Sequence, residues 1–446
     1  MGIDKIGRRK TVKVSIQTLG CKLNQAESEK LARELAKAGY ILVAPSEKVD
    51  IYVLNSCTVT NIADRKTRQA LRNMREANPD ALIIATGCYA DRAPDELMKI
   101  EGVQYAIGNK EKGRLIELLA NLEPAFVLDD AEHRLLAYPH SGLSAYPRSG
   151  LEADLRTRAF IRVQDGCSNY CAYCIVPYVR GGEKSRFAPE IVTEIKDLVN
   201  DGYKEVVLTG TEIGAYNSEG TNLKGLVEEI LSETGITRLR LSSLQPPEVT
   251  PSFVSLWRDN RLCRHFHLSL QSGSDTVLNR MRRHYVTSDY RGAVLLIRSQ
   301  MPEAAITTDV IVGFPGETDA EFEESYGFCE EMRFARIHVF SYSPRPGTAA
   351  AAMSGQIDGK IKKERSRKML SLSSESTRNS LEKFVNKTMN VLWESAIGGE
   401  GDGTWSGLTD NYIKVYIEAS RDLTNEFTNT RLIKFYRDGM WGEADG

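Results

Sequence analysis

Three cysteines lie within eight residues near the middle of the chain, at Cys167, Cys171 and Cys174. Three thiolates at the spacing C-x3-C-x2-C can bind three irons of a cubane cluster and leave the fourth iron without a protein ligand. Such an open metal position suits catalysis, whereas a structural zinc site is closed by four protein ligands. The alternatives are a zinc site that lacks its fourth ligand and three buried thiols. No second paired cysteine or histidine motif follows to complete a zinc site.

Three further cysteines, Cys21, Cys57 and Cys88, are far apart in the sequence, but each follows an expected strand by a few residues. In an open parallel sheet, ligand sites gather beyond the carboxyl ends of the strands. We therefore expect these thiols at one edge of a sheet, where they could bind a second metal cluster. The alternative is three unrelated core cysteines, since free cysteine often behaves as a small apolar residue. Cys263 and Cys329 have no comparable partners, and Cys329 is expected in the core.

Composition sets limits on the class of protein. A chain of 446 residues is long enough for roughly two to four domains. Its 41% apolar and 26% charged residues are typical of a globular protein, and the net charge of −2 means that any basic surface must be local. No run of about eighteen apolar residues predicts a membrane span, and the charged N-terminus lacks the apolar segment of a signal peptide. Eight cysteines are too few for a disulfide scaffold, so we expect a cytoplasmic protein.

Alternating strands and helices must position the outer cysteines. Apolar runs predict strands at 12–17, 49–55, 81–86 and 104–107. Amphipathic patterns predict helices at 25–38, 64–76 and 112–120, the first of them stopped by Gly39. This alternation predicts an open parallel α/β sheet domain over 11–122, covered on both faces. A Pro/Gly/Ser-rich linker is expected at 123–152.

The same alternation resumes around the central cysteines. Strands are expected at 159–164, 205–209, 238–242, 265–270, 307–312 and 336–340. Helices are expected between them, at 189–200, 223–232, 250–258, 289–299 and 320–332. Six such units predict a partial (β/α)6 barrel over 153–375, because a closed barrel of this type needs eight strands. The central cysteines follow its first strand, at the end where barrel enzymes place their chemistry.

The last part of the chain has a different pattern. A basic segment at 360–368 is expected to begin a helix that runs to about residue 385. Alternating residues predict strands at 389–393, 412–417 and 431–435, and the stretch 398–407 is rich in turn residues. A small all-β barrel over 376–442 fits this pattern.

The motifs together resemble a known family. The spacing of Cys167, Cys171 and Cys174 resembles the signature of radical S-adenosylmethionine enzymes. With the outer cysteines and the segments at 176–186 and 340–348, nearly the whole chain resembles the methylthiotransferase family of these enzymes. The resemblance implies an α/β fold in three parts: the cysteine-bearing sheet domain, the partial radical barrel and a C-terminal TRAM barrel that binds RNA.

The resemblance also implies cofactors and their sites. It implies S-adenosylmethionine and two [4Fe–4S] clusters, the outer one held by Cys21, Cys57 and Cys88, the radical cluster by the central three. It implies cofactor-binding residues at the strand ends: Gly210, Glu212, Ser269, Gln271 and Gly313. In the implied reaction, a first S-adenosylmethionine methylates a sulfur at the outer cluster. A second is cleaved at the central cluster, and its radical takes a hydrogen from C2 of an adenine.

The segment around Cys21 is closest to one branch of the family, which acts on N6-threonylcarbamoyladenosine at position 37 of tRNA. The nearest alternative is the branch acting on N6-isopentenyladenosine 37, and the branch acting on a ribosomal protein fits this segment less well. A non-catalytic RNA-binding protein with structural zinc is a rival of another class. Leu23, where valine is commoner, and Gln245, where many relatives carry an acidic residue, depart from the pattern.

The implied partners are the tRNA anticodon loop and an electron donor such as flavodoxin or ferredoxin, with the sulfur donor open and a monomer expected. Arg180 and Arg186 are candidates for the carboxylate of the threonylcarbamoyl group, by charge complementarity. Arg280, Arg282 and Arg283 could face the anticodon loop. The basic segment 360–368 is either a solvated helix face or a phosphate-binding surface. It precedes a possible stacking surface with Trp405, Tyr412, Lys414 and Tyr416.

Overall fold

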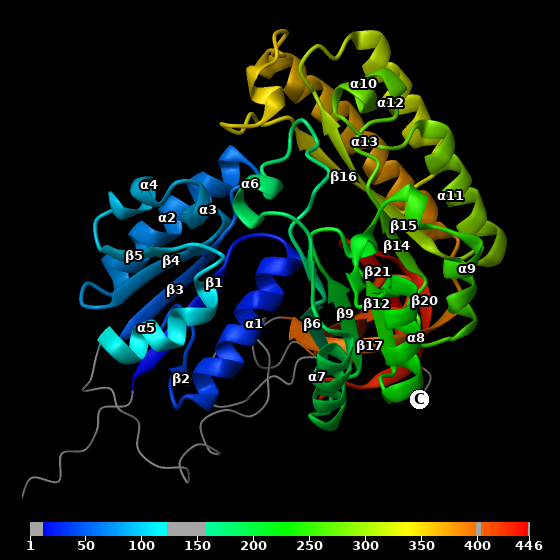
Figure 1. Ribbon diagram of the computed structural model, residues 1–446. Helices are drawn as coiled ribbons and strands as arrows, with labels where there is room; N and C mark the ends of the chain where they lie inside the picture. Colours follow the sequence, from blue (N-terminus) through cyan, green and yellow to red (C-terminus); the bar gives the residue numbers. More distant parts are fainter. Residues whose placement is uncertain (1–11, 123–156, 398–402, 445–446) are drawn as a thin grey trace, which may run out of the picture. The chain divides into compact units, whose positions relative to one another are not determined.

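A computed structural model describes residues 12–122, 157–397 and 403–444, which form two compact units (Figure 1). The first unit holds the described residues up to 122 together with Tyr178–Arg180, and the second holds the rest. The linker expected at 123–152 lies outside the described residues. None of the described helices is long and apolar enough to cross a membrane. The expected division into three domains stays a prediction.

A five-stranded parallel sheet forms the centre of the first unit, in the order β2-β1-β3-β4-β5. Its strands are β1 (Lys13–Thr18), β2 (Ile41–Leu42), β3 (Ile51–Ser56), β4 (Leu82–Gly87) and β5 (Val103–Ile107). The chain steps from β1 outward to β2 and then returns to β3 on the other side. The strand order therefore reverses between β1 and β3, and crevices at such switch points bind ligands in α/β proteins.

Helices cover both faces of this sheet, as the alternating pattern predicts (Figure 1). On one face, α1 (Lys22–Lys37) and α5 (Leu115–Leu122) pack with strand residues in a single apolar cluster. On the other face lie α2 (Asn61–Ala77), α3 (Cys88–Arg92) and α4 (Pro94–Met98), which contribute to a second cluster. The sequence did not predict β2, α3 and α4, because elements of two to five residues are too short to show a periodicity.

The second unit begins with six parallel strands that form the partial barrel. They are β6 (Arg158–Arg162), β9 (Glu205–Thr209), β12 (Arg238–Leu241), β14 (His265–Leu268), β15 (Ala305–Val312) and β16 (Arg336–Ser341). Two sheets, β12-β9-β6 and β13-β14-β15-β16, meet where β13 (Ser243–Leu244) follows β12 after one residue. The expected open (β/α)6 arrangement is confirmed.

Six of the described helices of the second unit pack on these strands in one large apolar core, to which Leu278 of the short α10 (Asp275–Arg280) also contributes. The six helices are α7 (Ala188–Asn200), α8 (Leu223–Glu233), α9 (Pro251–Val254), α11 (Thr287–Gln300), α12 (Asp319–Met332) and α13 (Gly359–Glu382). The helix expected at 250–258 is instead one α-helical turn, α9, followed by the 3-10 segment η6 (Ser255–Arg258). Short pieces of 3-10 helix are common at the ends of helices.

The chain ends in a closed five-stranded barrel, in the order β17-β18-β19-β21-β20. Its strands are β17 (Thr388–Ile397), β18 (Thr404–Thr409), β19 (Lys414–Glu418), β20 (Phe427–Tyr436) and β21 (Gly439–Ala444). The turn-rich reading of 398–407 was wrong from Thr404 onward, where β18 begins. Gly407 lies within this strand. The position requires glycine because a Cβ there would come 2.5 Å from the Leu392 carbonyl oxygen. Glycine marks close strand packing here rather than a turn.

Arginines of the partial barrel bind the closed barrel. Arg240 donates to the backbone oxygen of Asp410 at 2.9 Å and pairs with Glu205 at 2.7 Å, fully buried. Arg238 donates to the Leu408 oxygen at 2.9 Å. The ring of Tyr412 stacks on His265, with centroids 4.6 Å apart. The turn between β18 and β19 is therefore fixed against the polar side of the partial barrel.

Candidate active site

The first unit gathers Cys21, Cys57 and Cys88 at the carboxyl edge of its sheet. Cys21 is the N-cap of α1 after β1, Cys57 directly follows β3, and Cys88 begins α3 after β4. The three thiols are close enough to interact electrostatically, since Cys21 and Cys88 both contribute to raising the pKa of Cys57. The site therefore lies at the switch point between β1 and β3, as the argument from strand ends predicts.

Close packing and burial define this outer site. Gly20 has φ +148°, and a Cβ on it would come 2.9 Å from the Cβ of Cys57, so no larger residue fits here. Burial is the main cause that raises the pKa of Cys57 to about 12. Without a metal this thiol is protonated at neutral pH, whereas metal binding releases its proton. The three thiols at this sheet edge, those of Cys57 and Cys88 buried and that of Cys21 exposed, fit the donor set of an iron–sulfur cluster.

Arg180 ties the outer site together. Its Nε donates to Sγ of Cys88 at 3.3 Å, its Nη1 binds Oε1 of Glu27 at 2.8 Å, and its Nη2 binds Oδ1 of Asn24 at 2.9 Å. The ion pair is sealed from water, with the Arg180 side chain 2% exposed and that of Glu27 5% exposed. The sequence suggested Arg180 as a substrate contact, and this role stays a prediction. Its contacts place it beside the cysteines.

A second cation completes this network. Lys112 Nζ binds Oε2 of Glu27 at 2.5 Å and Oδ1 of both Asn55 and Asn109 at 3.1 Å. Asn109 Nδ2 in turn lies 3.7 Å from Sγ of Cys88. Burial raises the pKa of the Glu27 carboxyl, but Lys112 and Arg180 outweigh it and hold that pKa well below its usual range. Glu27 is therefore ionised, and two cations surround one carboxylate beside the thiols.

In the second unit, the central cysteines lie in the loop after β6. Gln164, in β7 (Gln164–Asp165), positions this loop: its Nε2 donates to the Gly166 oxygen at 2.7 Å, while its Oε1 accepts from the Glu212 backbone at 2.9 Å. Gly166 has φ +72°, and a Cβ there would come 2.1 Å from the Gly182 oxygen. Cys174 N donates to the Cys171 oxygen at 3.0 Å. The three thiols thus come from one tightly turned loop.

An arginine also contacts a cysteine of the central site. Arg283 Nη1 lies 3.2 Å from Sγ of Cys171, and its Nη2 binds Oε1 of Gln245 at 2.8 Å. Its guanidinium stacks over the ring of Tyr285, 4.7 Å from the centroid. Gln245, the position where an acidic residue was expected, therefore gives Arg283 a neutral partner. The sequence suggested Arg283 as an RNA contact, and this role stays a prediction.

Two carboxylates border the central site. Oε2 of Glu212 lies 3.1 Å from Sγ of Cys167 and also accepts from Asn169. Burial is the main cause that raises the pKa of Glu248 to about 8, and the charge of Glu212 adds to it. No lysine or arginine among the described residues lies within ion-pair distance of either carboxylate. A cationic group, such as the amino group and sulfonium of S-adenosylmethionine, would supply the missing charge.

The other expected cofactor residues lie at strand ends of the partial barrel. Gly210 follows β9. A Cβ on this residue would come 2.8 Å from the Gln164 backbone oxygen, so glycine allows this close approach. Gly313 follows β15 and makes room for the Lys362 side chain. Ser269 N donates to the Leu244 oxygen at 3.1 Å, and Gln271, at φ +69°, donates its N–H to the Asp309 oxygen at 2.8 Å. The cofactor contacts of these residues stay predictions.

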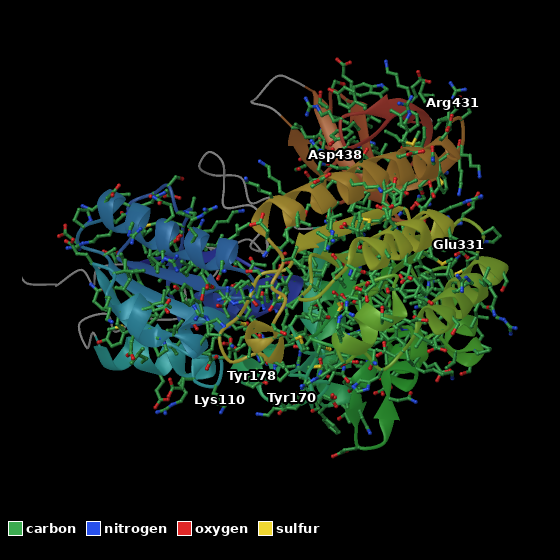
Figure 2. All side chains as sticks on the ribbon, turned by 90° about the horizontal axis from the view of Figure 1, so that it is seen from above. Lys110, Tyr170, Tyr178, Glu331, Arg431 and Asp438 are labelled. Atoms are coloured by element: carbon green, nitrogen blue, oxygen red, sulfur yellow. The ribbon has the colours of Figure 1, made fainter. Side chains whose placement is uncertain are left out.

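Several expected RNA contacts are engaged elsewhere. Arg186 binds Glu194 at 2.7 Å, and Arg280 binds Glu321 at 2.8 Å. Arg282 is exposed, and Lys414 lies 3.3 Å from Asp438, which Figure 2 labels on the closed barrel. Arg282 thus keeps an accessible charge, and Lys414 is 38% exposed beside Asp438. The binding of RNA by all four residues stays a prediction.

The aromatic residues that we expected to stack on RNA bases, Trp405, Tyr412 and Tyr416, do not form an exposed surface. Trp405 is 8% exposed, because it points from β18 into the core of the closed barrel. Tyr416 is 1% exposed on the other face of β19, where its ring packs against Tyr436 with centroids 5.2 Å apart and its hydroxyl binds Asp438. Tyr412 packs against His265. The basic segment at 360–368 is also partly structural, since buried Arg365 pairs with Glu317 at 2.7 Å. An alternating strand presents two faces, and the sequence did not reveal which one faces the core.

Sequence reasoning missed Glu27, Lys112 and Glu248. Glu27 lies six residues after Cys21, about 1.7 turns into the helix that Cys21 caps, so its place near the thiols could have been inferred from the sequence. Lys112 meets Glu27 across 85 residues of chain, and no local pattern signals such a pair. Glu248 caps a turn of 3-10 helix and accepts from the Gln245 backbone at 2.9 Å.

Comparisons with known proteins agree with this geometry. Residues 13–108 match the uncharacterized protein family UPF0004, and residues 161–329 match the radical SAM superfamily. The solved structure of the radical S-adenosylmethionine methyltransferase TsrM from Kitasatospora setae is 15% identical. It covers 77% of each chain with a TM-score of 0.56, a likeness of fold alone. The loop of three cysteines on a partial barrel thus defines a radical S-adenosylmethionine enzyme.

Two curated relatives narrow the class. The threonylcarbamoyladenosine tRNA methylthiotransferase MtaB of Bacillus subtilis is 35% identical over 443 residues, 96% of each chain. The tRNA-2-methylthio-N(6)-dimethylallyladenosine synthase of Thermodesulfovibrio yellowstonii is 32% identical over 435 residues, 96% of this chain and 98% of the relative. The chain therefore belongs to the methylthiotransferase family of radical S-adenosylmethionine enzymes. It is a transferase whose cofactors are [4Fe–4S] clusters and S-adenosylmethionine, as the sequence predicted.

Proposed function

We propose that this protein adds a methylthio group to C2 of N6-threonylcarbamoyladenosine at position 37 of tRNA. Relatives named for this activity, in Bacillus subtilis and Thermotoga maritima, are 35% and 36% identical and cover 96% of the chain. Those named for the dimethylallyl substrate reach 33% at most among the compared relatives. The difference in sequence identity is small. The assignment to the threonylcarbamoyladenosine branch therefore rests mainly on the sequence around Cys21.

The observation that supports a sulfur-inserting reaction is the presence of two sites with three cysteines each. One open cluster is enough to cleave S-adenosylmethionine, so a second group of thiols needs its own purpose. In the outer site, Cys21, Cys57 and Cys88 gather at a ligand-binding edge, and Arg180 donates to one of the thiols at 3.3 Å. A cluster there can carry the sulfur that the product gains.

The residues of each site have separate tasks. When bound, the central cluster and S-adenosylmethionine supply a radical able to take a hydrogen from an unactivated carbon. Glu212 offers a carboxylate to the cationic end of the cofactor, and Glu248, whose pKa burial raises to about 8, would ionise as that cation binds. Arg283 orients Cys171 through the N–H that it directs at Sγ. Arg180 orients Cys88 through the N–H that it donates to Sγ, and the buried ion pair with Glu27 holds Arg180 in place.

The proposal includes the surroundings of the reaction. The substrate is the anticodon loop of tRNA, and adenosine 37 leaves the stack to expose C2, as for other enzymes that modify a base. An electron donor such as flavodoxin or ferredoxin reduces the central cluster. The protein acts as a monomer in the cytoplasm, and the class of the sulfur donor is left open.

Mass spectrometry of nucleosides tests the proposal, with tRNA from cells that contain or lack the gene. We expect the 2-methylthio form of threonylcarbamoyladenosine to disappear without the gene and its precursor to accumulate. The wild-type gene restores the product, and a gene encoding Cys57→Ala does not. Loss of the isopentenyl derivative instead would show that the substrate is wrong and the chemistry right. No change in either nucleoside would contradict the proposal.

A further inference from the structure

Helix α2 (Asn61–Ala77) carries a row of basic residues on one face. Arg65, Arg68, Arg72 and Arg75 recur every three or four positions, so they lie along one side of the helix over about 15 Å. Arg65 and Arg72 are exposed, as is the neighbouring Lys66, while Arg68 and Arg75 are half-buried. In a chain with a net charge of −2, this row is a local concentration of positive charge.

The exposed basic residues of α2 have no carboxylate partner in the part of the chain that the structure describes. No carboxylate among the described residues pairs with Arg65, Lys66 or Arg72. Arg68 donates to the hydroxyl of Tyr89 at 2.6 Å, and this hydroxyl donates in turn to Glu96 at 2.7 Å, so Arg68 is partly compensated while Arg65 and Arg72 are not. The arginines of the cysteine site differ, since Arg180 is sealed in an ion pair with Glu27. The charge of the row is thus available to a partner outside the protein.

The position of α2 connects this row to the outer cysteines. The helix begins at Asn61, four residues after Cys57, and runs away from the cysteine edge of the sheet. Two exposed apolar side chains, Val59 and Ile62, lie between Cys57 and Arg65, 48% and 57% exposed. An apolar contact near the thiols, followed by a line of cations, suits a nucleotide chain with its bases and phosphates.

The other helices that begin at this edge lack such a surface. Helix α2 has five basic residues against two acidic ones, and one of the acidic ones, Asp64, is buried. Helix α1 has four basic residues against three acidic ones. Helices α3 and α4 together have one basic residue against three acidic ones. Among these described helices, α2 alone has a strong excess of positive charge.

We propose that the basic row of α2, led by Arg65 and Arg72, binds the phosphate backbone of the RNA whose adenosine reaches the outer cysteines. The inference rests on the proposed function, because the base that accepts the sulfur must come to the cysteine edge. The RNA strand on one side of that base then passes over a surface that borders this edge. Helix α2 offers the surface with the matching charge.

The salt dependence of binding tests this inference. The probe is a fluorescent anticodon stem-loop with N6-threonylcarbamoyladenosine at position 37, titrated with the cluster-loaded enzyme at several KCl concentrations. The variant Arg65→Gln/Arg72→Gln removes two phosphate contacts. Each contact contributes about 0.7 to the slope of log K against log salt for a single strand, so we expect the slope to fall by about 1.4. Affinity at 0.1 M KCl should fall roughly tenfold or more.

The control is Lys30→Gln/Lys37→Gln on α1, which removes two exposed charges from the helix on the opposite face of the sheet. Its slope and affinity should match those of the wild type. Iron content and the visible spectrum confirm that all three proteins are loaded and folded. If the arginine variant binds like the wild type, the inference is wrong while the proposed function stands. If the wild type itself does not bind the stem-loop, the proposed function fails as well.

Discussion

The two cysteine sites are built in opposite ways. The outer site collects Cys21, Cys57 and Cys88 from three strand ends of a parallel sheet. The central site takes all its thiols from one loop, which Gln164 holds against the end of β9. The first arrangement depends on the whole sheet domain, and the second mainly on local turns.

Their electrostatics differ as well. The outer site has a closed network, in which Arg180 and Lys112 both bind Glu27. In the central site, Arg283 has the neutral partner Gln245, and Glu212 and Glu248 have no described cation within ion-pair distance. The outer site is therefore satisfied by the protein itself, whereas the central site is prepared for a cationic ligand. This difference matches a sulfur-carrying site and a cofactor-cleaving site.

Replacing whole cysteine sets should separate the two sites most strongly. Alanine at Cys167, Cys171 and Cys174 should abolish both the cleavage of S-adenosylmethionine and the transfer, since no open iron remains. Alanine at Cys21, Cys57 and Cys88 should abolish the transfer only. Chromatography of 5′-deoxyadenosine together with nucleoside mass spectrometry measures both. Methylthiolated product from the second variant would show that the outer thiols are not needed.

Breaking the closed network should cost stability. In Arg180→Met, Glu27 loses one of its two cations in a buried position, which typically costs about 3 kcal/mol. Lys30→Met, which breaks the exposed pair with Glu34 at 3.8 Å, should cost no more than about 0.5 kcal/mol. Urea denaturation of the cluster-free proteins gives both values. Equal losses in the two variants would mean that the network does not stabilise the outer site.

Glu248 should make the central site sensitive to pH. Burial raises its pKa to about 8 in the folded chain, from about 4.3 when unfolded. The folded state then binds its proton more tightly, so the free energy of unfolding falls as pH rises from about 4 to about 8. Glu248→Gln cannot lose stability in this way. The free energy of unfolding of the variant minus that of the wild type should therefore rise across that pH range and then level off. A constant difference, measured by urea denaturation of the cluster-free proteins, would contradict the assignment.

The smallest effect is expected at Asn109, whose amide reaches Sγ of Cys88 at 3.7 Å and the Val179 oxygen at 3.1 Å. Asn109→Leu loses these contacts and the one to Lys112, a cost of about 1 kcal/mol. The hydrogen bond from Arg180 to Sγ of Cys88 remains in this variant, so the visible spectrum of the cluster-loaded protein should not change. A bleached spectrum would mean that Asn109, rather than Arg180, holds the outer site.

The positions of the cysteines followed from the sequence because parallel strands end at one edge, so a residue's place after its strand fixes its place in space. The six barrel strands were predicted from short stretches of apolar and β-branched residues, such as 310–312 in β15 (Ala305–Val312). The charge networks were not predictable, since Arg180 meets Glu27 across 153 residues. Trp405 was misplaced because alternation fixes two faces of a strand but does not identify the buried one.

The central claim is that each group of three cysteines holds its own [4Fe–4S] cluster. Iron and sulfide analysis of the anaerobically reconstituted protein tests it most directly. We predict about eight irons per wild-type chain, and about four in each variant with one cysteine set changed to alanine. About four irons in the wild type, with no loss when Cys21, Cys57 and Cys88 are replaced, would contradict it. So would zinc in place of iron at the outer site.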